Sequence, residues 1–426
     1  MLPMNFAEAL SYLLSLGHET LTIKLGLANT EALLTALGDP HKQLLAVQIA
    51  GTNGKGSTAA MLDSICRVAE VRTGLFTSPH LISITERITI DGQRVSEADF
   101  ARFTASVRKT AEELVKQGKL ETLPTFFEHV TAIALLAFRE AKVDLAILET
   151  GLGGRLDSTT AAGAAIVAIT SVSMDHEEYL GHSLAEIAAE KAAIIRPGVV
   201  AIIAPQETEA LEVITRRCEA VGVKPKFVEP SRYENISIGL RGRHQTTNAA
   251  TAIALTEALR EKGFAISREA ILKGVESARH PGRLELWAGP PRILFDGAHN
   301  PAAARALRDY LDEFAVQPTT MIFSAMRDKA LNEMASILFP ATDELILTEI
   351  DNPRAASLDM MKLAVSESLP ATKVRQASSI EDALRIANEV TPADSLICVT
   401  GSLYLVGAVQ KTLKESTAID HGRACH

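Results

Sequence analysis

The chain has 426 residues, 47 % of them apolar and 22 % charged, which is the balance of a soluble globular protein of roughly two or three domains. Its net charge of −9 and its aromatic content of 4 % argue against a general nucleic-acid surface, which needs clustered Lys and Arg or stacking aromatic rings. The four cysteines form no C-x-x-C pair, and the sequence contains neither a signal-peptide pattern nor an apolar run of about 20 residues. We therefore expect a cytoplasmic protein with reduced thiols and no membrane segment.

The first predicted strand, residues 44–50 (LLAVQIA), leads into the glycine-rich segment GTNGKGST at residues 51–58, and a helical pattern follows over residues 57–70. Closely spaced glycines let several backbone N–H groups face one anion, and a helix start adds partial positive charge. Lys55 can reach the outer phosphates of a nucleotide, and a Ser or Thr hydroxyl can bind Mg²⁺. The segment departs from the usual G-x-x-x-x-G-K-[ST] pattern, since Gly56 separates Lys55 from Ser57, and a structural turn is the alternative. Because a strand precedes it and a helix follows, we interpret the segment as a nucleotide-binding phosphate loop.

Short apolar runs alternate with amphipathic helical patterns over nearly the whole chain, which predicts an α/β protein with mostly parallel sheets covered by helices. Further strands are expected at residues 71–76, 144–149, 165–170, 199–204, 293–296, 320–323, 344–347 and 395–399. Helices are expected at residues 97–116, 126–141, 183–195, 244–262 and 302–314. Ser183 with Glu186 three residues later predicts a capping box at the start of one of these helices.

The turn-rich stretch HPGRLELWAGPP at residues 280–291 is the best candidate for a domain boundary. Gly289, Pro290 and Pro291 interrupt any helix or central strand there. We predict an N-terminal phosphate-loop ATPase domain over residues 1–289, a smaller C-terminal α/β domain over residues 290–415, and a tail over residues 416–426.

Polar side chains follow three of the expected strands at their carboxyl ends, where ligands bind in parallel sheets. Ser78 follows the strand at 71–76, Glu149 closes the strand at 144–149, and Asp175 with His176 follows the strand at 165–170. A carboxylate beside a phosphate loop is well placed to hold Mg²⁺. Each position has a structural alternative: a Ser-Pro turn, an ion pair of Glu149 with Arg155, and a histidine with a structural role.

Several cationic residues occur outside these strand ends. Lys191 lies on an amphipathic helix, in a position typical of a solvated surface charge. Arg241, Arg243 and His244 precede a helix that contains Asn248, and together they form a plausible anion site.

The segments around the predicted boundary leave two readings open. Arg283 could reach a phosphate group or be an exposed hinge residue. Asp296 and His299 could face a nucleotide, or the segment could serve only to start a helix, with Asn300 as its cap and Pro301 in its first turn. The ligand role and the cap role are compatible.

Taken together, these segments resemble the folylpolyglutamate synthase and dihydrofolate synthase family, which is related to the Mur peptidoglycan ligases. The resemblance extends from about residue 5 to residue 409 and rests on eight motifs that occur in one order. They are AGTNGKGST (50–58), TSPHL (77–81), ETGLGGRLDSTT (149–160), MDHEEYLG (174–181), AEKAAIIRPG (189–198), HPGR (280–283), DGAHNP (296–301) and TGS (400–402). The resemblance implies a phosphate-loop ATPase domain joined to a smaller Rossmann-like domain, with ATP and the substrates between them.

The resemblance also implies site residues, with Lys55, Lys191 and His176 as the catalytic ones. Phosphate binding is implied for Gly54, Lys55, Gly56 and Ser57, and further ATP contacts for Asn248, Arg283 and Asp296. Mg²⁺ coordination is implied for Ser78, Glu149 and His176, and a carbamylated Lys191 for a second metal ion, with a monovalent cation as a further cofactor. The segments that would hold the pterin end are Thr125, Phe126, Phe127 and Glu128, and Leu156, Asp157 and Ser158. His299 and Ser402 are assigned to the glutamate pocket, and Ser158-Thr159-Thr160 stands where many relatives have Ala or Ser followed by Thr-Asn.

The implied activity is an ATP-dependent amide ligation in which a carboxylate becomes an acyl phosphate and the amino group of L-glutamate attacks it. The implied substrates are dihydropteroate and reduced folates. Two rivals are a Mur-type ligase acting on a nucleotide-linked muramyl peptide and a non-catalytic nucleotide-binding switch. Only 43 residues precede Leu44, where Mur enzymes usually carry a further domain, and the full set of metal-ligand candidates favours a catalyst. No sequence feature demands an oligomer, so we expect a monomer.

Overall fold

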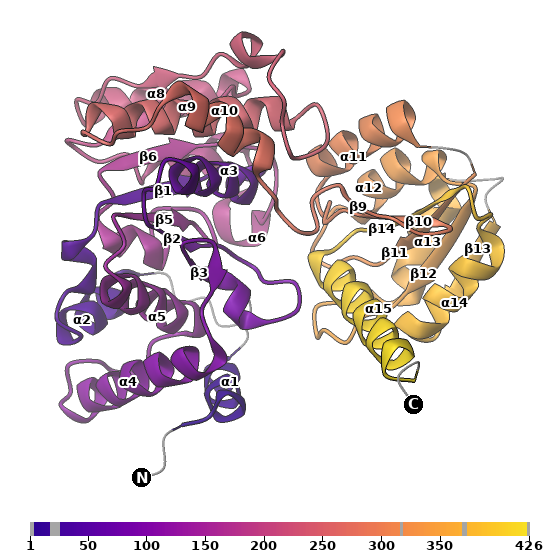
Figure 1. Cartoon of the computed structure of the whole chain (residues 1–426), viewed down its shortest axis with the longest axis horizontal. Helices are drawn as coiled ribbons and strands as arrows, with labels where there is room; N and C mark the ends of the chain where they lie inside the picture. Colours follow the sequence, from indigo (N-terminus) through magenta and orange to yellow (C-terminus); the bar gives the residue numbers. More distant parts are fainter. Residues whose placement is uncertain (1–3, 18–25, 316–317, 369–372, 424–426) are drawn as a thin grey trace. The chain divides into compact units, whose positions relative to one another are not determined.

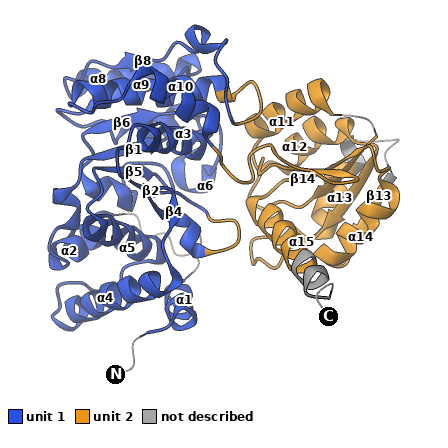
Figure 2. Ribbon diagram, viewed as in Figure 1, with its two compact units in different colours: residues 1–79, 84–239, 246–278 blue, residues 80–83, 240–245, 279–426 orange. Residues whose placement is uncertain are grey.

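The computed structural model describes residues 4–17, 26–315, 318–368 and 373–423 (Figure 1). The chain divides into two compact units (Figure 2). The first unit comprises residues 1–79, 84–239 and 246–278, and the second comprises residues 80–83, 240–245 and 279–426. Each unit contains its own sheet and its own apolar core.

The first unit is built on an eight-stranded sheet with the order β4-β3-β2-β5-β1-β6-β7-β8. Its strands are β1 (Ala46–Ala50), β2 (Thr73–Phe76), β3 (Ile88–Ile90), β4 (Gln93–Arg94), β5 (Leu145–Glu149), β6 (Ile166–Ile169), β7 (Val200–Ile203) and β8 (Lys226–Phe227). Six neighbouring strands are parallel, namely β2, β5, β1, β6, β7 and β8. β3 and β4 form an antiparallel edge beside β2. All residues of β1, β2, β5 and β6 are buried, as expected for parallel strands that are covered on both faces.

Helices cover both faces of this sheet, with α3, α9 and α10 on one side of the strands and α2, α4 and α5 on the other (Figure 1). The helices are α1 (Phe6–Ser15), α2 (Ala28–Ala36), α3 (Lys55–Val68), α4 (Glu97–Lys116), α5 (Phe126–Ala141), α6 (Glu177–Leu180), α7 (Leu184–Ala192), α8 (Thr208–Ala220), α9 (Gln245–Glu261) and α10 (Arg268–Ser277). Short 3₁₀ turns lie at Pro40–Gln43, Ile84–Arg87, Ser158–Ala162 and Pro230–Tyr233. The capping box predicted for Ser183 and Glu186 is confirmed at the start of α7.

The second unit contains a six-stranded sheet with the order β13-β12-β11-β14-β10-β9. Its strands are β9 (Glu285–Trp287), β10 (Arg292–Phe295), β11 (Thr319–Phe323), β12 (Glu344–Thr348), β13 (Lys373–Ala377) and β14 (Leu396–Thr400). Its helices are α11 (Pro301–Phe314), α12 (Leu331–Leu338), α13 (Leu358–Ser368), α14 (Ile380–Val390) and α15 (Leu403–Arg423), with a 3₁₀ turn at Phe339–Ala341. All neighbouring strands are parallel except β9, which pairs antiparallel with β10 at the edge.

Successive residues of the strands in this unit enter different cores. Leu294 and Cys398 belong to a cluster with residues of α11, α12 and α13. Phe295 and Val399 belong to a second cluster with residues of α14 and α15. Since side chains alternate along a strand, this division places helices on both faces of the second sheet as well.

The predicted α/β class with two mostly parallel sheets is confirmed, and each expected strand is present within two residues of its predicted bounds. The stretch at 280–291 contains a strand, β9, that the sequence analysis did not predict, and the long continuous segment of the second unit begins at Arg279. The expected tail from Ser416 is helical as far as Arg423, where α15 ends, and residues 424–426 lie outside the described residues. Among the residues that the structure describes, no helix is both long and apolar enough to span a membrane.

Candidate active site

The glycine-rich segment forms the turn between β1 and α3, at the carboxyl end of an internal strand of the first sheet. Gly51 has a φ of +148°, and Gly54, which precedes α3 as its N-cap, has a φ of +90°. A Cβ atom at Gly51 would collide with Thr170 Oγ1, and one at Gly54 would collide with Asn248 Oδ1. Both positions therefore require glycine, and the turn directs the first N–H groups of α3 to the end of the sheet, as a phosphate-binding loop needs.

Two lysine ammonium groups bind the same carbonyl of this phosphate loop. Lys55 Nζ donates to Gly51 O at 3.0 Å and to Thr52 O at 3.1 Å. Lys191 Nζ, from α7, donates to Gly51 O at 2.9 Å, and Lys191 is only 4 % exposed. Two positive charges beside a helix start create a favourable site for an anion such as a phosphate group. The solvated position that the helical pattern suggested for Lys191 is wrong, because the side chain is buried against the loop.

The carboxyl ends of β2, β5, β1 and β6 meet at one edge of the sheet, because these four strands are parallel neighbours. Glu149 is buried at the end of β5 and accepts a hydrogen bond from the backbone N–H of Ser78 at 3.1 Å. His176 precedes α6 with a φ of +54°, and its backbone N–H donates to Asp175 Oδ1 at 2.9 Å. The fold therefore brings Ser78, Glu149 and His176 to the edge that carries the phosphate loop.

The donor set at this edge fits Mg²⁺ rather than a metal held by a protein cage. Among the described residues, no group of three or more His, Cys, Asp and Glu side chains is arranged to hold a metal ion. Mg²⁺ does not need such a group, because it keeps several waters and binds one or two carboxylates together with substrate phosphates. Glu149, a buried carboxylate at the sheet edge that carries the phosphate loop, meets that requirement, and coordination by Ser78 and His176 stays a prediction. Arg155, the alternative partner considered for Glu149, forms its ion pair with Glu190 at 2.7 Å.

The first segment expected at the pterin end is also the start of α5. Thr125 is the N-cap of α5 and forms a capping box with Glu128, whose Oε2 accepts from the Thr125 N–H at 2.7 Å. The other carboxylate oxygen of Glu128 accepts from Thr30 Oγ1 at 3.1 Å. Phe126 is buried, and Phe127 is partly buried. Thr125 and Glu128 thus set the start of α5, and their contact with a substrate stays a prediction.

The second segment expected at the pterin end lies in the connection between β5 and β6, and its residues are Leu156, Asp157 and Ser158. Asp157 is buried, and one of its oxygens accepts from the N–H groups of Gly151 and Leu152 at 2.8 and 3.0 Å. Its other oxygen accepts from the N–H and the hydroxyl of Thr159. Burial raises the pKa of the Asp157 carboxyl, and these four hydrogen bonds act in the opposite direction. The carboxylate therefore holds the glycine-rich connection after β5 in shape.

In the second unit, Asp296 follows β10 and is buried. Its carboxylate accepts from the backbone N–H groups of Leu284 and Ala298, both at 2.9 Å. Burial raises the pKa of Asp296, and the nearby Arg283 lowers it. Arg283 Nη1 donates to Gly297 O at 3.4 Å. Asp296 and Arg283 thus lie in one group of contacts around the β10–α11 turn, and their contacts with ATP stay predictions.

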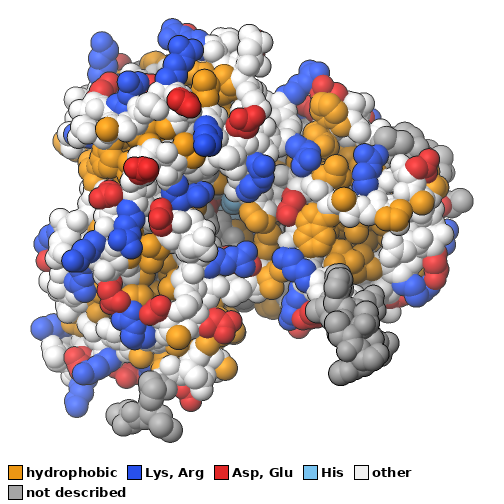
Figure 3. Space-filling model, viewed as in Figure 1, with side chains coloured by type: hydrophobic (Ala, Val, Ile, Leu, Met, Phe, Trp, Pro, Cys, Tyr) orange, Lys and Arg blue, Asp and Glu red, His pale blue; other side chains and the backbone are white. Residues whose placement is uncertain are grey.

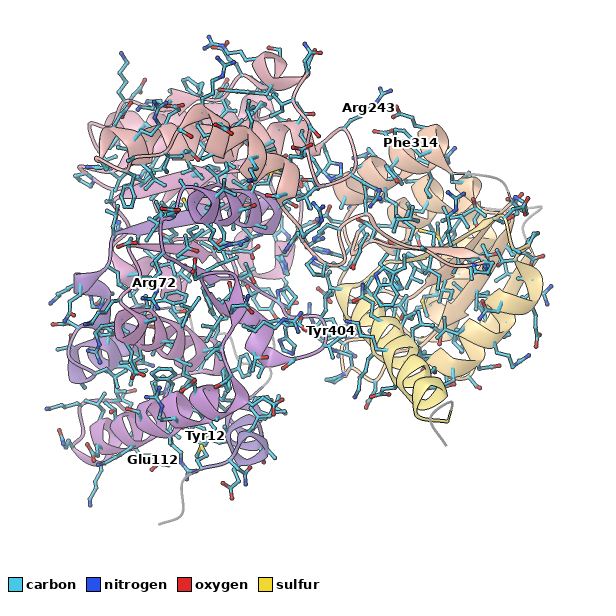
Figure 4. The ribbon with its side chains drawn as sticks, viewed as in Figure 1. Tyr12, Arg72, Glu112, Arg243, Phe314 and Tyr404 are labelled. Atoms are coloured by element: carbon cyan, nitrogen blue, oxygen red, sulfur yellow. The ribbon has the colours of Figure 1, made fainter. Side chains whose placement is uncertain are left out.

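The helix start predicted after Asp296 is confirmed, since Asn300 is the N-cap of α11 and Pro301 is its first residue. His299 Nδ1 donates to a backbone carbonyl at 2.8 Å. Ser402 is buried, and its Oγ accepts from the N–H of Tyr404 at 3.0 Å, where α15 begins (Tyr404 is labelled in Figure 4). The glutamate-pocket roles of His299 and Ser402 are not tested by these contacts.

The arginine-rich segment before α9 lies on the surface of the second unit. Arg243, which is labelled in Figure 4, is exposed and forms an ion pair with Glu313 at 2.8 Å. Its charge is therefore partly neutralised, which weakens the anion site considered for this segment. On the face drawn in Figure 3, basic and acidic side chains are interspersed over both units without a basic stripe.

One polar residue at the site was missed by the sequence analysis. Gln206 follows β7, and its side-chain amide binds the backbone at the ends of β6 and β7. The available signal was its position, because the residues after 199–204 lie at a fifth strand end of the same parallel sheet.

The chain matches two protein families over most of its length. Residues 49–223 match the Mur ligase middle domain, and residues 282–403 match the glutamate ligase domain of Mur ligases. The dihydrofolate synthase/folylpolyglutamate synthase of Bacillus subtilis is 34 % identical, and the alignment covers 93 % of this chain and 97 % of that protein. The chain spans about half the length of some longer curated relatives. The probable bifunctional folylpolyglutamate synthase/dihydropteroate synthase of Halobacterium salinarum is 35 % identical, and the alignment covers 95 % of this chain but 51 % of that protein.

Solved structures agree with these sequence matches. The folylpolyglutamate synthase of Mycobacterium tuberculosis complexed with ADP superposes with a TM-score of 0.87 at 32 % identity, covering 95 % of this chain and 98 % of that one. The bifunctional folylpolyglutamate synthase/dihydrofolate synthase of Yersinia pestis, complexed with AMPPNP and Mn ion, superposes with a TM-score of 0.82 at 30 % identity, covering 96 % and 98 %. The resemblance noted from the motifs is confirmed, and the chain belongs to the dihydrofolate synthase/folylpolyglutamate synthase family of Mur ligases.

Proposed function

We propose that the chain is an ATP-dependent ligase that adds L-glutamate to dihydropteroate and to reduced folates through an acyl phosphate. The observation that carries the proposal is the phosphate loop with Lys55 and Lys191 on one carbonyl, at the sheet edge that also holds Glu149. A relative that is 34 % identical over nearly its whole length is named for both activities. The match covers only half of the longer bifunctional relatives, so the proposal is limited to the ligase reaction.

The residues of the loop would bind and orient the outer phosphates of ATP. The N–H groups at the start of α3 face the loop, and the Lys55 ammonium would move from the carbonyls of Gly51 and Thr52 to the γ-phosphoryl group. Ser78, Glu149 and His176 would hold Mg²⁺, which when bound would supply positive charge beside the transferring phosphoryl group. Once the carboxylate carries phosphate, the amino group of glutamate can attack its carbonyl carbon, and phosphate leaves.

Lys191 is proposed as a carbamylated residue. Its side chain is buried beside the phosphate loop, and its ammonium group donates to the Gly51 carbonyl. Carbamylation would exchange this cation for a carboxylate that can hold a second metal ion. The ATP contacts of Asn248, Arg283 and Asp296 and the substrate contacts of residues 125–128 and 156–158 are part of the same proposal. A monomeric state and a cytoplasmic location remain predictions from the sequence.

The test is ATP-dependent incorporation of radiolabelled L-glutamate, run in parallel with dihydropteroate and with tetrahydrofolate in the presence of Mg²⁺ and a monovalent salt. Incorporation with both acceptors would support the proposal in full, and incorporation with one acceptor would restrict it to that reaction. Folded, ADP-binding protein that incorporates glutamate into neither acceptor would refute it. A nucleotide-linked muramyl peptide as the acceptor then distinguishes a Mur-type ligase from a non-catalytic switch.

A further inference from the structure

The phosphate loop is tied to the segment that follows β6 by five hydrogen bonds. Ser171 O accepts from the N–H groups of Thr52 and Asn53, at 2.8 and 3.1 Å. Thr52 Oγ1 donates to Ser173 O at 3.0 Å and accepts from the Ser173 N–H at 3.1 Å. Asn53 Nδ2 donates to Ser173 Oγ at 3.0 Å. The position of the loop therefore depends on where residues 171–173 lie.

Those residues are in turn held by Gln206 in the loop after β7. Gln206 Oε1 accepts from the Val172 N–H at 3.0 Å. Gln206 Nε2 donates to Thr170 O at 2.9 Å and to Ala204 O at 3.1 Å. Because carbonyl oxygens can only accept and the Val172 N–H can only donate, these partners determine which way the amide points. The amide of Gln206 thus binds the backbone of Thr170 and Val172 at the end of β6 and the backbone of Ala204 at the end of β7.

Thr170 connects this network directly to the first glycine of the loop. Its N–H donates to Ala50 O at 2.8 Å, and its hydroxyl donates to the same carbonyl at 3.2 Å. The Thr170 hydroxyl also occupies the space that a Cβ at Gly51 would fill. A displacement of the end of β6 would therefore move the phosphate loop as well.

We propose that Gln206 is a positioning residue for nucleotide binding, which it supports through residues 170–173 without contacting the nucleotide. The inference rests on the proposed function, since it assumes that the phosphate loop holds ATP. A loop that binds phosphate through backbone N–H groups must keep them within a fraction of an ångström of their positions. Residues 171–173 also lead to His176, so Gln206 sets the spacing between the loop and the predicted metal ligand.

Two substitutions separate the contacts of Gln206. Gln206→Leu keeps a similar volume and removes both the donor and the acceptor. Gln206→Glu keeps an oxygen for Val172 and places a carboxylate oxygen against the carbonyls of Thr170 and Ala204. We expect both variants to bind MgADP about tenfold more weakly in calorimetry and to raise the KM for ATP by a similar factor. The KM for the pteroate substrate should change less than twofold.

Three comparisons distinguish positioning from general stability. Gln93→Leu, at an exposed glutamine of β4 in the same unit, should leave MgADP affinity unchanged. Ser173→Ala, which removes the acceptor of Asn53 Nδ2, should weaken MgADP binding two- to threefold, and its effect should be smaller when Gln206 is already leucine. Thermal unfolding of each variant reports whether the folded fraction has changed.

Unchanged MgADP affinity in folded Gln206→Leu and Gln206→Glu would overturn the proposal. A fall in kcat that follows the folded fraction, with the KM for ATP unchanged, would also overturn it, as would wild-type protein that does not bind MgADP. Wild-type protein that binds MgADP but incorporates no glutamate would refute the proposed ligase reaction, while the weaker MgADP binding of the Gln206 variants would still support the positioning role.

Discussion

Acidification from pH 7 to pH 4 should destabilise the first unit through a buried histidine, His129, in the first turn of α5. Its Nδ1 lies 3.0 Å from Thr125 O and its Nε2 lies 3.0 Å from the Tyr12 hydroxyl. A carbonyl can only accept, so Nδ1 carries the proton and Nε2 accepts from Tyr12. This assignment holds for the neutral ring, which burial favours in the folded protein at pH 7 by lowering the pKa of His129. Figure 4 shows Tyr12 beside Glu112, and burial raises the pKa of Tyr12 to about 12, which keeps its hydroxyl protonated and able to donate throughout this pH range.

The size of the effect follows from the pKa of His129, which burial lowers from 6.5 to about 4. Between these two values the unfolded chain binds a proton that the folded chain does not bind, so protons favour unfolding. The stability that the neutral ring provides is complete above pH 6.5 and is lost as the pH falls to about 4. At 1.36 kcal/mol for each pKa unit, the loss is on the order of 3 kcal/mol. Because His129 is 0 % exposed, solvent screening does not reduce this figure appreciably.

The assay is urea unfolding followed by far-UV circular dichroism at several pH values between 7 and 4. His129→Gln removes the titrating ring, and its amide oxygen can still accept from Tyr12. We expect the variant to be less stable than wild type at pH 7 and to lose about 3 kcal/mol less on acidification. His182→Gln, at an exposed histidine of the same unit, is the matched control and should follow the wild-type curve. Parallel curves for wild type and His129→Gln would refute the reasoning.

The remaining predictions concern the site. Lys55→Ala should lower kcat/KM at least about 10²-fold without unfolding the chain, and retained turnover would contradict its phosphate contact. Glu149→Gln should raise the Mg²⁺ concentration needed for half-maximal activity, because it removes the carboxylate and leaves an acceptor for the Ser78 N–H; an unchanged Mg²⁺ titration would show that Glu149 is not a ligand. Lys191→Ala should lose activity that short carboxylates partly restore, and an undiminished variant would exclude carbamylation. Asp157→Asn should lower the free energy of unfolding by about 2–5 kcal/mol, since its NH₂ group would face two buried donors, and a loss below about 1 kcal/mol would contradict this.

Local sequence patterns were sufficient for the elements that bury an apolar run. β1, β5 and β6 are covered on both faces, so nearly every residue in them is apolar, and their patterns are visible without knowledge of their neighbours. The glycine pattern at residues 51–58 likewise predicted the phosphate loop, because positive φ angles at Gly51 and Gly54 restrict those positions to glycine.

The strands that the sequence analysis missed depend on their partners. β3, β4, β8 and β9 contain only two or three residues each, and most of these residues are exposed or half-buried. β13 (Lys373–Ala377) was also missed, and it is an edge strand that pairs with β12. β9 exists because residues 285–287 pair with β10 across the turn at Gly289 to Pro291, which local propensity marks only as an interruption. A strand of this length is stabilised by hydrogen bonds to a neighbouring strand, which its own residues do not encode.

The site residues divide in the same way. The sequence by itself determined which strand ends carry Ser78, Glu149 and His176, since each follows a recognisable strand and parallel strands end at one edge. Only the tertiary structure decided that Lys191 is buried on Gly51, that Glu128 binds Thr30, and that Gln206 holds residues 170–173. Lys191 and Gly51 are 140 residues apart in the chain. The exposure of a polar side chain depends on which distant backbone packs against it, and helical or strand periodicity contains no information about that contact.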